Sequence, residues 1–322
     1  MPTTVRIVPS TDWPAHLTTH RSTLDQIEAR MRNGGVDDGT LRLFEVLEHW
    51  RANSPSDVWS ELSQTLIREH PIMDVVLGDP ITRRAFEQPR GYAGDAELLD
   101  LFYGLANPHH YRDCSARDLS VSEIVATRGA AAAVRDRRSR IAALVDRIAE
   151  RVDRPRVLSV AAGHLREAEL SQAARAGELA EWIALDQDEE SLRLVQQQYG
   201  HLGVTTWPGS IDDILKGKAS FSGLDCVYSA GLYDYLNERL AQRLTACLFE
   251  SLRPGGTLLL ANFLRGISDA GFMEACMRWS LIYRDADDMR GLLDEIPSTD
   301  VDRASVYHDT EGQLVYLEVT KR

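Results

Sequence analysis

A turn of very small residues follows a short apolar run in the stretch Arg154–Leu170, RPRVLSVAAGHLREAEL. The run ends at Val160 and has the length of a buried strand, and Ala161, Ala162 and Gly163 come directly after it. In an open α/β sheet, ligands bind at the carboxyl ends of the strands, where bulky side chains would keep ligand atoms away from the backbone. The small residues therefore indicate a ligand-binding turn.

An acidic residue stands where a nucleotide-type ligand would need one. Ribose hydroxyls are usually held by a carboxylate at the end of the second strand, about 20 residues after the turn. Asp186, in WIALDQDEESL, follows Gly163 by 23 residues. The alternative is that Asp186 only caps the helix that follows it.

The chemistry of the turn favours a nucleoside ligand that carries no phosphates. A dinucleotide site requires G-x-G-x-x-G, whereas this turn has one glycine, and Glu167 close behind it would repel a pyrophosphate. S-adenosylmethionine is the common phosphate-free alternative, and its sulfonium suits an acidic protein. We therefore expect S-adenosylmethionine rather than NAD as the cofactor.

The elements that must position these residues change in character along the chain. Helical spacing of apolar residues predicts helices over residues 23–34, 38–53 and 54–71, and one long helix over residues 121–155. After Pro155, short apolar runs alternate with helical stretches, which predicts a doubly wound, mostly parallel sheet. The runs lie at residues 156–161, 181–186, 203–208, 224–229 and 257–263.

The chain end predicts an antiparallel pair, because two β-rich runs flank Asp309-Thr310-Glu311-Gly312. The expected fold is a seven-stranded α/β sheet preceded by an all-helical lid domain. We place the helical domain at residues 1–125 and the cofactor-binding domain at residues 126–322.

Composition excludes several classes of function. The net charge of −13 argues against nucleic acid as a partner. The start of the chain lacks a signal-peptide pattern, and no apolar run approaches the roughly 20 residues that span a membrane. Four scattered cysteines form no zinc or disulfide pattern, and no metal motif is present. We expect a cytoplasmic, metal-free monomer or homodimer that acts on a small molecule.

Five segments, taken in order, resemble the motif series of class I S-adenosylmethionine-dependent methyltransferases. They are VLSVAAG, ALDQD, PGSI, GLDCVYSAGLYDYL and LRPGGTLLLANF. A closer resemblance, carried by QPRGYAGDAELLDLFY, YSAGLYDYL and FMEACMRWSLIYRDADDM, is to the bacterial extracellular-factor 3-hydroxypalmitic acid methyl ester biosynthesis proteins, which methylate a fatty-acid carboxylate. The first turn departs from that family's A-C-G-P-x-R-E, since Ala162 replaces the cysteine and His164 the proline.

The class resemblance implies roles for residues at matching positions. The first turn would line the methionine moiety, and Asp186 would take the ribose hydroxyls. Segments after the third and fourth strands would contact the adenine and pass beneath the transferred methyl group, and one arginine of the cluster at residues 135–140 would turn toward the methionine carboxylate. The predicted cofactor-binding residues are Ala161, Ala162, Gly163, Asp186, Gln187, Ser210, Ile211, Ser229, Ala230, Gly231 and Arg138.

The residues expected to bind the methyl acceptor lie in the loops after the fourth and fifth strands and in the PRGYAGD loop. That loop either binds the substrate or forms a structural corner. A helix over residues 278–289 is expected to close the pocket, and the adjacent histidines at 109 and 110 are either solvated or bases on a lid. Candidate catalytic residues are Tyr92, Tyr233 and Asp234. Candidate substrate-binding residues are Arg90, Tyr92, His110, Tyr235, Asn262, Trp279, Tyr283 and Arg284.

The reaction expected is in-line methyl transfer to an oxygen or nitrogen of a small metabolite, with S-adenosylhomocysteine as the second product. A carboxylate acceptor, with a pKa of about 4, is already ionised at neutral pH and needs no base. An amine or hydroxyl acceptor would need one, and Asp234 is also a candidate helix cap. Carboxylate methylation is the preferred prediction, N- or O-methylation in a specialised pathway is the alternative, and a cofactor-binding sensor without turnover is a third.

Overall fold

The computed structural model describes residues 13–322, with side chains from Thr18 onward, and divides into two compact units. The helical unit comprises the described residues up to Ala93 together with Asn107–Thr127 and Ser268–Ser280. The sheet unit comprises Gly94–Ala106, Arg128–Ile267 and Leu281–Arg322. The units therefore interleave along the chain, since a segment near residue 100 belongs to the sheet unit and one near residue 275 to the helical unit.

The helical unit is built from helices that bury apolar side chains against one another. Leu24, Met31, Leu43 and Leu47 from the first two helices are almost fully buried. The third predicted helix is present as α3, continued by a π-helical turn. The helices are α1 Trp13–Arg32, α2 Val36–Asn53, α3 Ser56–Glu61, η1 Leu62–Ile67, α4 Ile72–Val76, α5 Pro80–Glu87, η2 Pro108–Tyr111, α7 Ala116–Thr127 and α13 Ala270–Cys276.

The helix α13 joins this unit although the chain reaches it only after the fifth strand. Phe272 stacks on Phe44 of α2 with ring centroids 4.0 Å apart. Glu274 accepts a hydrogen bond from the Trp59 indole at 2.6 Å. Gly271 lies directly against the backbone of Leu47 and Glu48. The close approach requires the absence of a side chain at residue 271.

The sheet unit contains a seven-stranded sheet in the order β3-β2-β1-β4-β5-β7-β6. The first five positions in this order are parallel, and β7 pairs antiparallel with both β5 and β6, as the hairpin signal predicted. Strand order reverses between β1 and β4, so a ligand site is expected at their carboxyl ends. The strands are β1 Arg156–Val160, β2 Glu181–Asp186, β3 Val204–Pro208, β4 Leu224–Ser229, β5 Leu252–Phe263, β6 Val301–His308 and β7 Leu314–Lys321.

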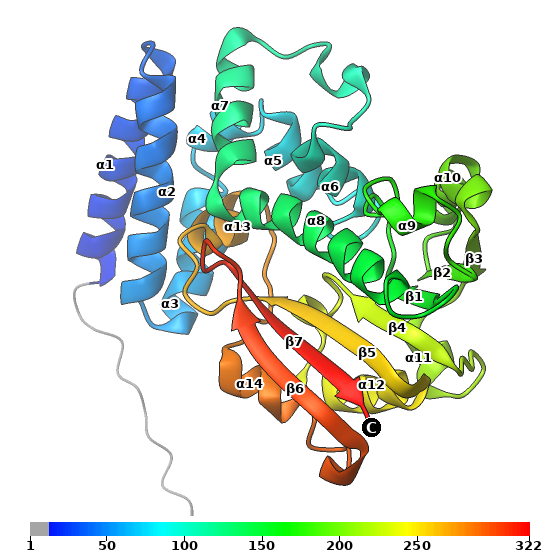
Figure 1. The fold of residues 1–322 in the computed structure, drawn as a ribbon. Helices are drawn as coiled ribbons and strands as arrows, with labels where there is room; N and C mark the ends of the chain where they lie inside the picture. Colours follow the sequence, from blue (N-terminus) through cyan, green and yellow to red (C-terminus); the bar gives the residue numbers. More distant parts are fainter. Residues whose placement is uncertain (1–12) are drawn as a thin grey trace, which may run out of the picture. The chain divides into compact units, whose positions relative to one another are not determined.

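Helices of the sheet unit cover both faces of this sheet (Figure 1). One face packs apolar residues of β1, β2, β4, β5 and β7 against Leu244 and Leu248 of α12 and Met289 of α14. The opposite face contacts α8, which crosses the sheet beside β4. The helices of this unit are α6 Ala96–Tyr103, α8 Gly129–Ala149, α9 Gln172–Arg175, α10 Glu189–Tyr199, η3 Gly200–Leu202, α11 Ile211–Leu215, η4 Tyr233–Tyr235, α12 Glu238–Glu250, α14 Ala286–Gly291 and η5 Ser298–Asp300.

Two sequence predictions about helices are wrong. The single helix predicted over residues 121–155 is two helices, because Arg128 adopts an extended conformation (φ −62°, ψ 161°) between α7 and α8. The amphipathic helix predicted over residues 278–289 is not formed before Ala286. Arg278 has a positive φ of 53°, and Arg284 forms an isolated bridge with Leu264, so this segment is extended beside the end of β5.

No helix within residues 13–322 combines the length and the apolar character that crossing a membrane requires.

A methyl group at Gly271 should destabilise the helical unit. The Cβ atom of Gly271→Ala would stand 2.6–2.7 Å from backbone atoms of Leu47 and Glu48, which cannot move aside as a side chain can. We expect a loss of about 1–3 kcal/mol in the free energy of unfolding, measured by urea denaturation. Gly291→Ala is the control, because its Cβ would meet no atom closer than 4.0 Å. Equal stability of the two variants would contradict the packing of α13 on α2.

Candidate active site

The turn after β1 is tied to the end of β2 by the carboxylate of Asp186. Its Oδ2 accepts a hydrogen bond from the backbone N–H of Gly163 at 2.8 Å, and its Oδ1 accepts one from Asp188 at 2.9 Å. Ala162 donates to the carbonyl of Leu185 at 3.0 Å. Burial raises the pKa of Asp186, and the two backbone hydrogen bonds oppose that rise. The carboxylate is thus both a structural tie and an acceptor at the ligand end of the sheet.

The backbone of the turn adopts the left-handed conformation at two of its small residues. Ala161 and Gly163 both have positive φ, 56° and 54°. A Cβ at Gly163 would lie 3.2 Å from the Cβ of Ala96, so the first turn of α6 packs closely over this position. Only residues with little or no side chain can bring these two backbones together.

The ends of β1 and β4 are joined by Ser229. Its hydroxyl donates to the carbonyl of Val160 at 3.0 Å, so this predicted cofactor residue fixes the spacing of the two strands. Ala230 and Gly231 follow and are half-buried.

Residues after β3 take mainly structural positions. Ser210 and Asp213 form a reciprocal capping box at the start of α11, in which Asp213 accepts from the Ser210 hydroxyl and N–H, both at 2.9 Å. Ile211 packs against the core. Gln187 is exposed directly after Asp186. An adenine contact in this region remains a prediction.

The loop after β4 is organised by buried polar groups. Asp234 accepts a hydrogen bond from the N–H of Phe263 at 2.7 Å. Arg284 donates to the carbonyl oxygens of Tyr233 and Leu236, at 2.6 and 2.5 Å, and to Oδ1 of Asn262 at 2.6 Å. The amide of Asn262 donates in turn to the carbonyl of Ile282 at 2.8 Å. These bonds hold the η4 loop, the end of β5 and the segment before α14 together.

This arrangement corrects three sequence-based assignments. Tyr233 is fully buried and its hydroxyl pairs with Thr245 of α12 at 2.9 Å, so it points into the core rather than toward an acceptor. Arg284 and Asn262 are almost fully buried, and their polar atoms are hydrogen-bonded within the loop. All three position the loop and do not present free groups to a substrate.

Asp234 differs from its neighbours because it is a buried carboxyl that titrates near neutrality. Burial raises its pKa to about 7, while the Phe263 hydrogen bond and the charges of Arg137 and Arg284 oppose the rise. A general base is most effective with a pKa near the working pH. The catalytic role of Asp234 stays a prediction.

Two neighbouring arginines on α8 have different surroundings. Arg138, predicted to face the cofactor, lies 4.6 Å over the ring of Tyr103 and pairs with Glu169 at 3.4 Å. Arg137 instead donates to the carbonyl of Ala230, at the end of β4. The structure therefore brings Arg137, rather than Arg138, to the candidate site.

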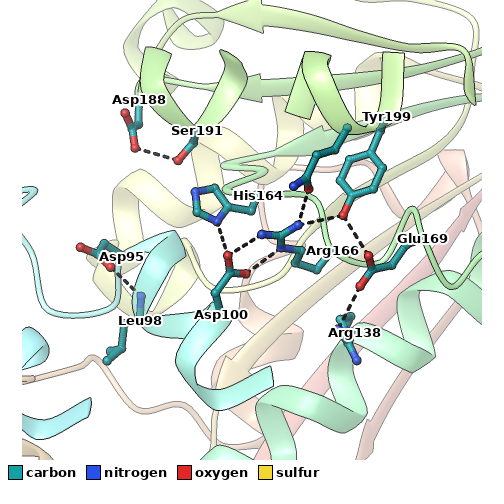
Figure 2. A network of polar contacts seen from close by, with 11 residues as sticks. Asp95, Leu98, Asp100, Arg138, His164, Arg166, Glu169, Asp188, Ser191 and Tyr199 are labelled. Carbon is teal, nitrogen blue, oxygen red and sulfur yellow. Dashed lines mark hydrogen bonds and ion pairs between the residues drawn. The ribbon is translucent and has the colours of Figure 1, made fainter. Parts of the chain in front are cut away.

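A buried network that the sequence analysis missed connects α6 with the first turn (Figure 2). Asp100 accepts two hydrogen bonds from Arg166, at 2.7 and 2.5 Å, and one from Nδ1 of His164 at 2.8 Å. Arg166 continues to Tyr199 of α10 at 3.2 Å. Burial raises the pKa of Asp100, but the hydrogen bonds from Arg166 and His164 outweigh it and hold that pKa below its ordinary value. Asp100 therefore stays ionised and anchors the turn that contains Gly163.

Other predicted substrate residues are in the helical unit or at the surface. Arg90 and Tyr92 lie in the loop after α5, where Gly91 has a φ of 88°, His110 lies in η2, and Trp279 is buried within the helical unit. Tyr235 is exposed and Tyr283 is half-buried, both in the sheet unit. The substrate roles of these residues stay predictions.

The sequence does not distinguish Arg137 from Arg138. Arg137 falls three positions after Val134 and four before Ile141, whereas Arg138 falls four after and three before, so both have helical spacing to the same apolar residues. Only the fold shows that Arg137 is the one buried against the end of β4. Asp100 likewise had no signal in the sequence, because only the fold brings it to His164 and Arg166.

Comparisons with solved structures agree on the fold. A possible exported protein from Bordetella parapertussis is 16% identical, with a TM-score of 0.56 over 89% of this chain and 96% of that one. The CurJ carbon methyltransferase is 14% identical, with a TM-score of 0.51 over 95% of this chain and 93% of that one. The chain has the fold of class I methyltransferases. No protein-family model and no curated protein matches the sequence.

Removing the charge of Asp100 should strongly destabilise the sheet unit. Asp100→Asn would leave the buried guanidinium of Arg166 without its counter-ion, so we expect a loss of about 3–5 kcal/mol in unfolding free energy. Arg166→Met added to Asp100→Asn should recover part of it, because no unpaired charge then remains. Additive effects of the two substitutions in urea denaturation would contradict the pairing.

The stabilisation by Asp100 should depend on pH. Because the pKa of Asp100 is lowered on folding, its contribution to the free energy of unfolding is present above its ordinary pKa of 3.8 and is lost as pH falls below that value.

Proposed function

We propose that this protein is an S-adenosylmethionine-dependent methyltransferase that acts on a small metabolite, with a carboxylate oxygen as the preferred acceptor. The observation that carries the proposal is the turn after β1, whose backbone N–H at Gly163 is held by the carboxylate of Asp186 at 2.8 Å. This pair lies at the carboxyl ends of adjacent strands in a sheet of methyltransferase topology.

The residues present fit such a cofactor. The first turn offers backbone without bulky side chains, at Ala161, Ala162 and Gly163. Asp186 offers a buried carboxylate whose lone pairs are suited to ribose hydroxyls, beyond the two backbone hydrogen bonds it already accepts. Gly231, two residues after β4, adds no side chain to this region. S-adenosylmethionine, when bound, supplies an electrophilic methyl group on a sulfonium.

The protein's own contribution to the reaction is position and the exclusion of water. Holding reacting atoms about 3 Å apart in line supplies up to roughly 7–11 kcal/mol of the barrier reduction. Ser229 and Asp186 hold the strand ends on either side of β1, and the Arg284 cluster holds the loop after β4. A carboxylate acceptor then requires no proton transfer, since it is ionised at neutral pH.

The sequence resemblance to enzymes that methylate the carboxylate of a 3-hydroxy fatty acid supports the acceptor class. That resemblance is carried by three segments, QPRGYAGDAELLDLFY, YSAGLYDYL and FMEACMRWSLIYRDADDM. The acceptor-binding roles of Arg90, Tyr92 and Trp279 stay predictions of the resemblance.

A second candidate function is methylation of an amine or hydroxyl, with Asp234 as general base. The observation that favours it is the pKa of this buried carboxyl, about 7, in the loop that follows β4. A carboxylate acceptor gives such a group no proton to remove, so the two functions differ in their dependence on Asp234.

The acceptor class can be identified by incubating the purified protein with methyl-labelled S-adenosylmethionine and a panel of 3-hydroxy fatty acids, amines and phenols. We expect a base-labile methyl ester, identified by mass spectrometry. Label on nitrogen or on a phenolic oxygen would replace the ester proposal with the second candidate. Cofactor binding without transfer to any acceptor would indicate a sensor.

Asp186→Asn should weaken binding of S-adenosylhomocysteine by about 10- to 100-fold in calorimetry, because hydrogen bonds to a charged carboxylate are lost. Glu189→Gln is the matched control, since it removes one negative charge from an exposed position three residues away. Unchanged affinity in Asp186→Asn would remove the anchor of the proposed site.

The pH dependence of turnover should separate the two functions. Ester formation should be nearly constant between pH 6 and 8, because a free carboxyl has a pKa of about 4. Methyl transfer that uses Asp234 as a base should instead rise through pH 7 and be lost in Asp234→Asn.

The stability of the protein should report the same titration. Because folding raises the pKa of Asp234 above 3.8, wild type should lose stability relative to Asp234→Asn as pH rises from about 4 to about 7. A flat stability difference would show that Asp234 does not titrate there.

A further inference from the structure

Arg137 is a buried cation at the end of β4. Only 4% of its surface is exposed. Its Nη1 donates a hydrogen bond to the carbonyl of Ala230, and the hydroxyl of Tyr103 is a further neighbour that interacts with its charge. A Cβ placed on Gly231 would lie 3.6 Å from Nη1 and 3.8 Å from Nη2, so the guanidinium lies alongside the backbone that follows β4.

This guanidinium has no carboxylate within ion-pair distance among the residues whose side chains the structure describes, 18–322. Nearby arginines differ in this respect. Arg166 pairs with Asp100 at 2.5 Å, Arg138 with Glu169 at 3.4 Å, and Arg140 of the same helix with Asp136.

Two carboxyl groups attract Arg137 from a greater distance, but both have other partners. Glu167 accepts a hydrogen bond from the Tyr228 hydroxyl at 2.5 Å, and Asp234 accepts one from the Phe263 N–H at 2.7 Å. Burial raises the pKa of each, and for Asp234 it raises it to about 7, so the charge of Asp234 is only partial near neutral pH. The cation therefore remains under-compensated within the sheet unit.

A buried charge is costly unless it is paired, and a protein retains one where something else completes the pair. The guanidinium is a planar fork that matches a carboxylate with two parallel hydrogen bonds. An anion at this position would also lie at the carboxyl end of β4, beside the topological switch point where ligands bind in this fold.

We propose that Arg137 binds a carboxylate group of a ligand at the end of β4. The proposal rests on the proposed methyltransferase function, which offers two sources of that group: the methionine portion of the cofactor and an acid acceptor. Both present the same chemistry to the guanidinium, and cofactor analogues distinguish them.

The test compares Arg137→Gln and Arg137→Lys with wild type in calorimetry. The probes are S-adenosylhomocysteine and 5′-deoxy-5′-methylthioadenosine, which keeps the nucleoside and thioether but lacks the carboxylate. Arg147→Gln is the control, because it removes one positive charge from an exposed position on the same helix. Turnover of the acid acceptors of the panel is measured for the same proteins.

If the carboxylate is the cofactor's, Arg137→Gln should weaken S-adenosylhomocysteine binding by about 10- to 100-fold, leave methylthioadenosine binding unchanged, and be partly rescued by lysine. If it is the acceptor's, affinity for both nucleosides should be unchanged, and KM for the acid should rise by a similar factor. In either case ligand-free Arg137→Gln should melt no lower than wild type, because a buried unpaired charge has been removed.

Equal loss of affinity for both nucleosides, or a lower melting temperature with no change in binding or KM, would overturn the proposal and give Arg137 a purely structural role. Wild type that binds neither nucleoside would overturn the methyltransferase proposal along with it. Wild type that binds S-adenosylhomocysteine while the Arg137 variants behave like Arg147→Gln would overturn this inference alone.

Discussion

The hydrogen bonds from two backbone N–H groups to the carboxylate of Asp186 set the geometry of the ligand end of the sheet. One N–H belongs to Gly163, in the turn after β1, and the other to Asp188, at the start of α10. Because both oxygens of a single buried side chain are used, the turn and the end of β2 cannot shift independently. The hydrogen bond between Ser229 and Val160 ties the ends of β1 and β4 in the same way.

Three buried arginines of the sheet unit differ in their hydrogen-bond and ion-pair partners, and these partners indicate the role of each. Arg166 is neutralised by Asp100 and stabilises the first turn. Arg284 donates to two carbonyl oxygens and an amide, which shapes the loop after β4. Arg137 has one carbonyl and no close counter-ion in the described part of the chain, so its charge remains available to a ligand. These partners distinguish Arg166 and Arg284, which stabilise the fold, from Arg137, for which we propose a binding role.

The loop after β4 is held by more buried hydrogen bonds than its sequence suggests. Tyr233, Asn262 and Arg284 are all polar residues near strand ends, yet each is committed to the core or to the loop. Asp234 shares this environment, and the same burial that immobilises it raises its pKa to about 7. A loop held by so many hydrogen bonds suits the proposed catalysis, which depends on alignment of the reacting groups.

The sequence alone determined the class of fold and the position of the turn of small residues after β1. Alternating short apolar runs and helical stretches, the small residues 161–163 and the spacing to Asp186 are local patterns, and local backbone preferences and burial suffice to interpret them. The tertiary structure decided which polar side chains are committed to the core and to the loops. Neighbouring residues such as Arg137 and Arg138 have the same chemistry, and helix rotation against β4 separates the buried one from the one paired with Glu169. Asp100 meets Arg166 across 66 residues of chain, and segment 278–284 is extended because Arg284 binds the η4 loop and the end of β5; both depend on long-range contacts that no local pattern encodes.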